Sequence, residues 1–424
     1  MYKNEALERR LSCVIYEYSV YSYQIQIRID AVNVSTPQYI WQREDWPHWR
    51  WSESALKSAL DAVQRKQDFL AGLAQALDVD HLGLAVAELT AREAVSTSAI
   101  EGVNLDPDEV RSSIMRRLGL GVSEEKEDRL NAAARGMIDV LADSTQNIGL
   151  LTLERLFAWH EVMFPSGRSG LSLLLVGMLR GEAPMQVLSG ALGRERVHYE
   201  APPRDRLDAE MERFLTWFNA RKTPDNTLRA CVAHLWFETL HPFEDGNGRI
   251  GRAIFDLALA QGAKFHSDRV SRLWAVSAIL LRRRKDYYRQ LERAQKGDLD
   301  ITDWLLWSVA TIEQSCNEAR VCIERVVQIS RFWARHRDTP FSPRQRRLLQ
   351  MALAPNDPEE GWLTAKRAAR QTKVERVTAS RDLSRLEELG VIEKDASVGG
   401  RSTRYRVRLD DAGPLRLVGD LIWS

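Results

Sequence analysis

His241-Pro242-Phe243-Glu244-Asp245-Gly246-Asn247-Gly248-Arg249-Ile250-Gly251-Arg252 is the most informative stretch of this 424-residue chain. Gly246, Asn247 and Gly248 tolerate backbone angles that bulky residues avoid, so their N–H groups can form a concave anion nest. The nest opens onto the start of a helix, where free amides and the helix dipole favour phosphate. The pattern therefore predicts a phosphate-binding loop that leads into a helix.

The side chains of this stretch suit a polyphosphate that is bound to a metal ion. Arg249 and Arg252 are three residues apart and share one helix face, so both guanidinium groups can fork onto phosphate oxygens. Asp245 offers a hard oxygen ligand for Mg²⁺, and His241 is a base with a suitable intrinsic pKa. We expect His241 to be catalytic and Asp245 to hold the metal.

The stretch resembles the signature of the Fic family, His-Pro-Phe-x-Asp/Glu-Gly-Asn-Gly-Arg-x-x-Arg, at every specified position. The resemblance implies a mainly α fold: a helical core with a β-hairpin flap. Most Fic enzymes transfer AMP from ATP, with Mg²⁺, to a Tyr, Thr or Ser hydroxyl of a target protein. His241 would then take the proton of the target hydroxyl as its oxygen attacks the α-phosphorus.

A second motif, Thr97-Ser98-Ala99-Ile100-Glu101-Gly102, is similar to the Fic inhibitory motif. In the family, a glutamate at this position pairs with the second signature arginine, here Arg252, and diverts it from the γ-phosphate. Residues Thr97, Glu101 and Gly102 would carry this autoinhibition, on a helix N-terminal to the core. The motif is short and occurs by chance in many proteins. Its presence in a chain that also carries a complete signature makes it a specific indication of the inhibitory element.

The resemblance also suggests which residues contact ATP. The nest amides and Asn247 would meet charge on the phosphoryl oxygens, and Arg249 with the metal would hold the leaving pyrophosphate. Tyr288 and Gln295 are assigned to the adenine side by analogy. The predicted ATP-binding set is Glu101, Arg194, Glu195, Arg196, Val197, Gly246, Asn247, Gly248, Arg249, Arg252, Tyr288 and Gln295.

The chain divides into four predicted segments: a poorly ordered leader at 1–38, a helical module with the inhibitory motif at 39–125, the catalytic core at 126–335, and a winged helix-turn-helix at 336–424. Trp41, Trp46, Trp49 and Trp51 indicate an aromatic mini-core. Helical periodicity spans 54–77, 82–100 and 152–162, and His234 is interpreted as a packed core residue. Strands within 185–200 would form the flap, an exposed edge that receives a target segment.

The C-terminal segment has its own charge balance. Residues 363–409 hold 12 Lys or Arg against 6 Asp or Glu, in a chain with a net charge of +1. Helices at 342–352, 364–371 and 374–389 precede two expected strands around 390–392 and 403–407. This order is typical of a winged helix, and the excess of cations suits phosphate contacts. The predicted DNA contacts are Arg376, Arg381, Arg401 and Arg404; packing or dimerisation is the equal alternative.

Composition sets the remaining bounds. Four cysteines form no Cys-x-x-Cys pair, which suits a reducing cytosol, and no apolar run is long enough to span a bilayer. We therefore expect a cytoplasmic protein with no membrane partner. The target protein is not identified and could be the chain itself. Whether the chain forms a homodimer is also left open.

Three alternative functions stay open. Phosphorylation by an inverted nucleotide is disfavoured, because that branch usually has Lys where this chain has Gly248. Hydrolytic removal of AMP, with Glu101 aligning a water, uses the same residues. A transcription regulator whose core senses nucleotide is the third, and the C-terminal module supports it.

Overall fold

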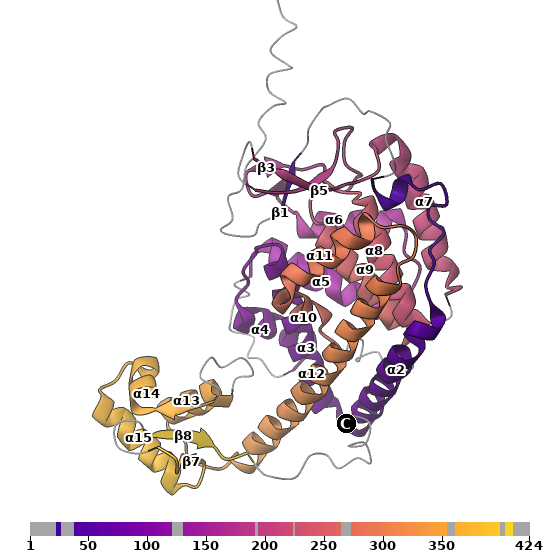
Figure 1. The fold of residues 1–424 in the computed structure, drawn as a ribbon. Coiled ribbons are helices and arrows are strands. Elements are labelled where there is room, and N and C mark those ends of the chain that lie inside the picture. Colours follow the sequence, from indigo (N-terminus) through magenta and orange to yellow (C-terminus); the bar gives the residue numbers. More distant parts are fainter. Residues whose placement is uncertain are drawn as a thin grey trace, which may run out of the picture. The chain divides into compact units, whose positions relative to one another are not determined.

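The computed structural model describes residues 23–26 as backbone, and 38–120, 130–190, 194–223, 225–263, 273–353, 361–398 and 403–409 in full. The fold is mainly helical, as predicted, with a few short strands (Figure 1). Its contacts divide the chain into two units, Met1–Ala319 and Arg320–Ser424. The division falls inside one long helix, α12 (Thr302–Arg335).

The first unit holds most of the helices and the strands of the predicted flap. Its described elements are β1 (Tyr23–Gln26), the 3-10 turn η1 (Ile40–Gln42), α2 (Glu53–Ala76), α3 (Val79–Ile100), α4 (Pro107–Arg117), α5 (Ala132–Gln146), α6 (Leu153–Met163), β2 (Arg168–Ser169), β3 (Ser172–Leu173), β4 (Gln186–Ser189), β5 (Arg196–Glu200), α7 (Arg204–Ala220), α8 (Asn226–Leu240), α9 (Asn247–Gly262), α10 (Val276–Arg282) and α11 (Arg284–Gln295).

Helix boundaries follow local capping chemistry. Ser52, Asp78 and Thr152 accept a backbone N–H at the starts of α2, α3 and α6, as N-cap side chains do. Gly102 has a φ of 80°, which L-residues rarely adopt, and it follows the C-cap of α3. The helices predicted at 54–77, 82–100 and 152–162 are thus confirmed, to within three residues at each end.

The core of this unit is built around α8. Every residue of α8 from Thr227 to Leu240 is buried, and the helix packs against α7, α9 and α11. A helix that is buried on all sides lies in the interior of the fold, and here that includes the polar side chains of Arg229, His234 and Glu238. Figure 1 shows α8 and α9 among the surrounding helices. The signature loop between these two helices is therefore held by the most buried part of the unit.

The tryptophan-rich segment reaches beyond a local mini-core. The rings of Trp46 and Trp49 each lie 5.9 Å, centroid to centroid, from that of Trp236 on α8. The indole of Trp46 also donates to the buried Glu210 carboxylate on α7, at 2.8 Å. Trp46 and Trp49 pack on each other, with ring centroids 4.9 Å apart, so the predicted aromatic cluster is confirmed for this pair, and the further partners of the pair come from the central helices. Local sequence spacing could not show those partners, which are almost 200 residues away.

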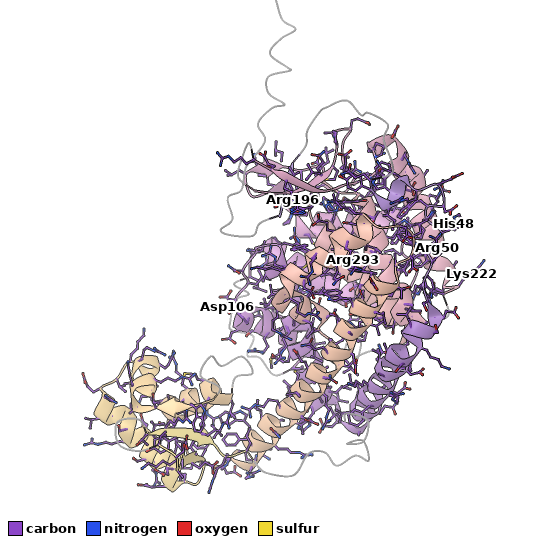
Figure 2. The ribbon with its side chains drawn as sticks, in the orientation of Figure 1. His48, Arg50, Asp106, Arg196, Lys222 and Arg293 are labelled. Carbon is purple, nitrogen blue, oxygen red and sulfur yellow. The ribbon has the colours of Figure 1, made fainter. Side chains whose placement is uncertain are left out.

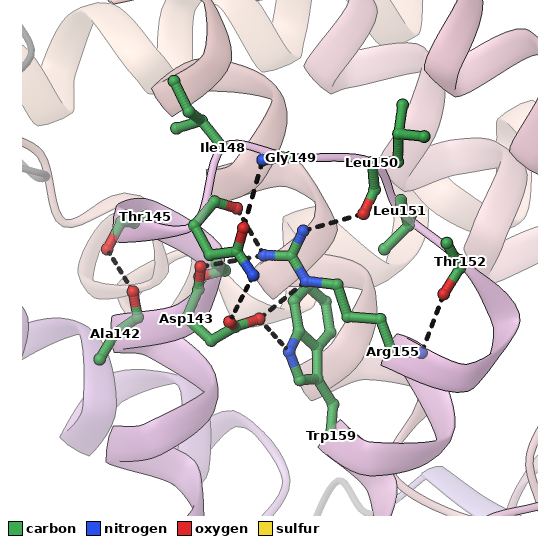
Figure 3. Close-up of polar contacts among 12 residues, drawn as sticks. Ala142, Asp143, Thr145, Ile148, Gly149, Leu150, Leu151, Thr152, Arg155 and Trp159 are labelled. Atoms are coloured by element: carbon green, nitrogen blue, oxygen red, sulfur yellow. Dashed lines mark hydrogen bonds and ion pairs between the residues drawn. The ribbon is translucent and has the colours of Figure 1, made fainter.

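A polar cluster fixes the turn between α5 and α6 (Figure 3). The Arg155 guanidinium binds the Asp143 carboxylate at 2.8 Å and reaches the carbonyl oxygens of Asn147 and Leu150. Trp159 donates its indole N–H to the same Asp143 oxygen, at 2.7 Å. These bonds satisfy carbonyl groups that the chain turn would otherwise leave open, so they hold α6 in place beside the signature loop.

The flap region forms a three-stranded sheet in the order β1-β4-β5. The strands β4 and β5 make the predicted hairpin, with a bulge between Val187 and Leu188. The strand β1 pairs antiparallel with β4, from Tyr23 opposite Ser189 to Gln26 opposite Gln186. The edge of β4 that was expected to be exposed is therefore covered. The rest of the predicted leader, 1–22 and 27–37, lies outside the described residues.

The second unit has a small core of its own. Its elements after α12 are α13 (Pro343–Leu353), β6 (Leu363–Thr364), α14 (Ala365–Thr372), α15 (Arg376–Glu388), β7 (Ile392–Lys394) and β8 (Arg404–Val407). Buried apolar residues from these elements surround Leu348, Leu383 and Leu386. The three helices lie within two residues of their predicted bounds and β8 within one, whereas β7 lies two residues later than the strand expected around 390–392. The strand β6, which pairs with β8, was not predicted.

Among the helices of the described ranges, none combines the length and the apolar character that a membrane crossing requires.

Candidate active site

His241 lies at the point where α8 ends. It is the C-cap residue, with φ 47° and ψ 59°, an uncommon conformation for a residue other than glycine. Its side chain is 6% exposed. Its Nδ1 lies 3.3 Å from the Glu238 carbonyl oxygen, which can only accept, so Nδ1 carries the proton. Among the described residues, its Nε2 has no hydrogen-bond partner.

The surroundings of His241 keep its imidazole neutral. Burial is the main cause that lowers its pKa to about 4, and the positive charge of Arg180 adds to the effect. A neutral imidazole with a free Nε2 lone pair is a general base that is ready to accept a proton. The geometry is compatible with a catalytic role for His241, which stays a prediction.

Arg180 holds the His241-Pro242 turn and was not predicted from the sequence. Its Nε donates to the His241 carbonyl oxygen and its backbone N–H to that of Pro242, both at 2.9 Å. A third bond reaches the Pro202 carbonyl oxygen at the base of the flap. The side chain is 2% exposed, and burial lowers its pKa to about 10. Arg180 thus couples the base-carrying turn to the segment that follows β5.

The loop after His241 depends on one glycine and on Asn247. Gly246 has a φ of 83°, and a Cβ there would lie 2.8 Å from the Phe164 ring, so only glycine fits. The Asn247 side chain accepts from the Phe243 N–H at 2.9 Å and donates to the Phe243 carbonyl at 2.8 Å. Both polar atoms of this side chain are therefore committed to the loop. Asn247 was expected to contact phosphate. Because its side chain is occupied by Phe243, only its backbone N–H remains for that contact.

The first turn of α9 offers a site for an anion. The first helical bond in this turn is from Ile250 N–H to the Gly246 carbonyl. In the described part of the chain, the N–H groups of Asn247, Gly248 and Arg249 have no acceptor. Free N–H groups at a helix N-terminus bind phosphate. The predicted nest is thus one left-handed glycine followed by a helical turn, because Asn247 and Gly248 are already helical.

The predicted contact between Glu101 and Arg252 is present. The Glu101 carboxylate Oε1 lies 2.8 Å from Arg252 Nη2. Thr97 adds two bonds to the guanidinium, from Nε to its hydroxyl at 2.7 Å and from Nη2 to its carbonyl at 3.0 Å. Burial alone would lower the pKa of Arg252, but the Glu101 charge holds it above its ordinary value.

Gly248 lets the Glu101 carboxylate approach the start of α9. A Cβ at Gly248 would lie 2.3 Å from Glu101 Oε1 and 3.0 Å from Arg252 Nη1. The carboxylate therefore sits directly against the helical turn whose N–H groups are free. A negative group in this position would compete with a bound phosphate both for the N–H groups and for Arg252.

Arg249 and Asp245 contact another part of the chain, at the end of α6 and at β2. Arg249 is 9% exposed, and its guanidinium lies 4.8 Å from the Phe164 ring centroid. In the described chain its Nε has no partner. Asp245 Oδ1 accepts the Gly246 N–H at 2.5 Å, and Oδ2 accepts the Ser169 hydroxyl of β2. Ser169 was not predicted, because nothing in its sequence context marks it.

The residues around Asp245 fit a magnesium ion carried by a nucleotide. No group of three or more His, Cys, Asp or Glu side chains that could hold a metal occurs among the described residues. Magnesium commonly binds proteins through one or two carboxylates and takes its other ligands from phosphate and water. Each carboxylate oxygen of Asp245 keeps a further lone pair, so this one side chain is compatible with such an ion.

The residues predicted to contact ATP from the flap and from the adenine side differ in their exposure and contacts. Arg194 and Arg196 are exposed, Glu195 is half-buried, and Val197 is 36% exposed. Tyr288 is half-buried, with the Arg284 guanidinium 5.7 Å from its ring centroid. Gln295 is 5% exposed and donates to the Glu238 carbonyl at 3.1 Å. Gln295 therefore braces the end of α8 with its side-chain amide.

Glu238 is a buried carboxyl group that the sequence interpretation missed. Its Oε2 lies 3.9 Å from His241 Nδ1, and its Oε1 has no hydrogen-bond partner in the described chain. Burial raises its pKa to about 8, against the opposing charge of Arg252. His234, in contrast, was interpreted correctly: it is buried and bonded to the Tyr287 hydroxyl at 2.7 Å.

Two family descriptions match this chain. Residues 39–120 match a domain of unknown function (DUF4172). Residues 150–259, which include the flap, α8, the signature loop and α9, match the Fic/DOC family. The chain contains a Fic/DOC domain. The recognition made from the signature is thereby confirmed for this segment.

A curated relative supports the same family at the level of sequence. The chain is 25% identical over 107 residues to a probable protein adenylyltransferase of Aquifex aeolicus (strain VF5). The match covers 25% of this chain and 30% of the relative, so the chain spans less than a third of that protein's length. The Fic domain therefore has a transferase among its relatives.

Solved structures of Fic proteins are also similar. A Fic family protein from Desulfovibrio desulfuricans G20 has a TM-score of 0.45 and 21% identity, covering 83% of this chain and 96% of that one. Fic-1 (residues 134–508) from C. elegans has a TM-score of 0.45 and 17% identity, covering 66% and 74%.

Proposed function

We propose that this protein transfers AMP from ATP to a hydroxyl group of a protein, through its Fic domain. The observation that carries the proposal is the free Nε2 of the buried, neutral His241 beside the open N–H groups of the first turn of α9. A base and an anion site in this arrangement suit the attack of a hydroxyl on a phosphate group.

The target hydroxyl would give its proton to His241 Nε2 as its oxygen bonds to the α-phosphorus. The bond from that phosphorus to the β-phosphate oxygen breaks, and pyrophosphate leaves with the electron pair. The N–H groups of Asn247, Gly248 and Arg249 stabilise the charge of the phosphate oxygens. Magnesium held by Asp245 would supply positive charge to the polyphosphate.

We propose further that Glu101 restrains this reaction. Its carboxylate holds Arg252 and lies against Gly248. An arriving γ-phosphate would therefore find the Arg252 guanidinium already bound and would be repelled by the negative charge of Glu101. Thr97 fixes Arg252 in the same orientation through its hydroxyl and carbonyl. Release of Glu101 would leave the guanidinium with the phosphate as its natural partner.

Parallel incubations with α-labelled and γ-labelled ATP test the proposal. We expect the α-label alone to appear on protein, and His241→Ala to lower transfer by about 10²–10⁴-fold, the usual contribution of one general base. His48→Ala is the matched control, because His48 is an exposed imidazole that contacts the Asp45 carbonyl. Transfer by the His241 variant within tenfold of the control would reject the assignment.

Removal of AMP is a second candidate, favoured by the position of Glu101. Its carboxylate is 29% exposed and lies next to the anion site, so it could orient a water toward a bound phosphodiester. AMP-modified protein incubated with wild type and with Glu101→Gln separates the two activities. Loss of AMP only in the presence of Glu101 supports the hydrolase.

A further inference from the structure

Three side chains of the flap and of α11 form a continuous hydrogen-bonded row. The Ser189 hydroxyl, at the end of β4, lies 2.5 Å from Nε2 of His198 on β5. Nδ1 of the same imidazole lies 2.9 Å from Oε2 of Glu292 on α11. A hydroxyl, an imidazole and a carboxylate in this order are the arrangement that activates a serine nucleophile.

The carboxylate sets the direction of the two hydrogen bonds. An ionised carboxylate only accepts, so Nδ1 of neutral His198 carries the ring proton and donates it to Glu292. The Nε2 lone pair then faces Ser189, whose O–H donates to it. The imidazole is thus oriented to take the hydroxyl proton.

Glu292 is well placed to stay ionised. Although burial by itself would raise its pKa, hydrogen bonds from Lys296 and His198 hold that pKa below its ordinary value. Lys296 Nζ lies 2.8 Å from Oε1, and Arg196 Nη2 lies 3.3 Å from the same oxygen. The second oxygen is left to His198.

The Ser189 hydroxyl is more accessible to solvent than the His198 imidazole, as a nucleophile and its base require. His198 is 8% exposed, whereas Ser189, at the end of β4, is half-buried. The next residue, Gly190, has a φ of 116°, and a Cβ there would lie 2.6 Å from the Arg194 carbonyl oxygen. The orienting imidazole is shielded while the hydroxyl can be reached.

An arginine is paired with Ser189 across the sheet. Arg196 is the cross-strand partner of Ser189, and directly paired residues in a sheet share a face. The Arg196 side chain is 70% exposed, and Figure 2 shows it at the sheet. An exposed guanidinium next to a nucleophile favours an electrophile with phosphate oxygens.

We propose that Ser189 is a nucleophile, activated by His198 and Glu292, that accepts a phosphoryl group from an activated phosphate ester. The Ser189 oxygen bonds to phosphorus, the ester bond to the leaving group breaks, and the leaving group departs with that electron pair. The Ser189 proton moves to His198 Nε2 and from there to the leaving group. This reaction needs neither His241 nor ATP, so it stands apart from AMP transfer.

A fluorophosphonate probe on the full-length protein tests the proposal, with mass spectrometry of the peptide that contains Ser189. The probe loses fluoride when serine attacks its phosphorus. We expect Ser189 to be the serine that is labelled fastest. His198→Asn, which keeps a donor but lacks the base, should slow labelling by at least about tenfold. Glu292→Gln should slow it as well, because the charge that orients the imidazole is lost.

Two controls separate activation from folding. Glu200→Gln alters another β5 carboxylate, which bonds to Gln186, and should label as wild type does. His241→Ala should also label normally, even where AMP transfer is lost. No preferential labelling of Ser189 in the folded wild type overturns the proposal. Equal labelling of the His198→Asn variant does the same, and the row would then only fasten the flap to α11.

Discussion

Glu101 and Arg252 are 151 residues apart in the chain and 2.8 Å apart in space. Their contact joins the end of α3, in the module that precedes the Fic domain, to the second signature arginine. The guanidinium is 3% exposed, so a charge partner in this position matters more than it would at the surface. The module and the Fic domain therefore meet where a phosphate would bind.

Glu101→Gly should raise AMP transfer roughly ten- to hundredfold at fixed ATP. A freed phosphate contact and a lifted repulsion are each of the order of 1–3 kcal/mol, and about 1.4 kcal/mol is a factor of ten. Initial rates with α-labelled ATP measure the gain, and Glu101→Gln should give a smaller one because it keeps an acceptor. Adding Arg252→Ala should abolish it. A Glu101→Gly rate equal to wild type would make Glu101 only a helix-end residue.

The acid limb of the pH–rate profile should lie near pH 4. Burial lowers the pKa of His241 to about 4, so its imidazole stays neutral well below the pH at which an exposed imidazole titrates. In the Glu101→Gly protein, kcat/KM should then change little between about pH 5.5 and pH 7. A fall centred near pH 6.5 would show that the base is more solvated than the structure indicates.

Asp245→Ala should raise the Mg²⁺ concentration needed for half-maximal transfer and lower the rate at saturation. The change removes the one signature carboxylate beside the anion site. Ser169→Ala is the matched control, because it removes the hydroxyl that bonds to Asp245 and leaves the carboxylate. It should shift the titration less. An unchanged titration in Asp245→Ala would place the metal on other ligands.

The sequence was sufficient where one short motif carries the geometry. The free His241 nitrogen, the left-handed Gly246 and the Glu101–Arg252 contact all follow from two motifs that belong to a known pattern. In these places the residues that matter are neighbours in the chain, or the resemblance to the family pairs one motif with the other.

Other parts depend on contacts between distant residues that no local pattern reveals. Arg180 reaches the His241 carbonyl across 61 residues, and Ser169 reaches Asp245 across 76. Each is an ordinary polar residue in its own segment. Asn247 was assigned to phosphate from the resemblance to the family signature. Only the folded loop shows that Phe243 takes both of its polar atoms.

DNA binding by the C-terminal unit stays a prediction. The structure leaves two of the four predicted DNA contacts, Arg376 and Arg381, as the best candidates. Arg376 and Arg381 are exposed on α15, while Arg404 binds the Asp395 carboxylate at 2.6 Å and stacks on Trp362; Arg401 lies outside the described residues. Arg376→Ala with Arg381→Ala in the full chain should weaken binding to duplex DNA and reduce its salt dependence. Arg404→Ala should have a smaller effect. Wild type that shows no gel shift at low salt would exclude a DNA-binding role.

Glu238→Gln should remove a loss of stability that the wild type shows as pH rises. The folded carboxyl has a pKa of about 8, raised mainly by burial from an ordinary value of 4.5. Between pH 4.5 and 8 the unfolded chain releases this proton while the folded protein keeps it, so stability falls with pH across that window. Below pH 4.5 the contribution of the protonated carboxyl is fully present.

The glutamine variant keeps the size of the side chain and cannot titrate, so its stability should lack this slope. The difference in unfolding free energy between variant and wild type should grow from pH 4.5 to pH 8 by more than about 1 kcal/mol, since each pKa unit corresponds to about 1.4 kcal/mol. Urea unfolding at several pH values measures it. Arg252, Glu101 and His241 all face Glu238, so the same comparison in Glu101→Gly should give a smaller difference, because one repelling charge is gone. A difference that stays constant with pH would mean that Glu238 is ionised in the folded protein, paired with Arg252.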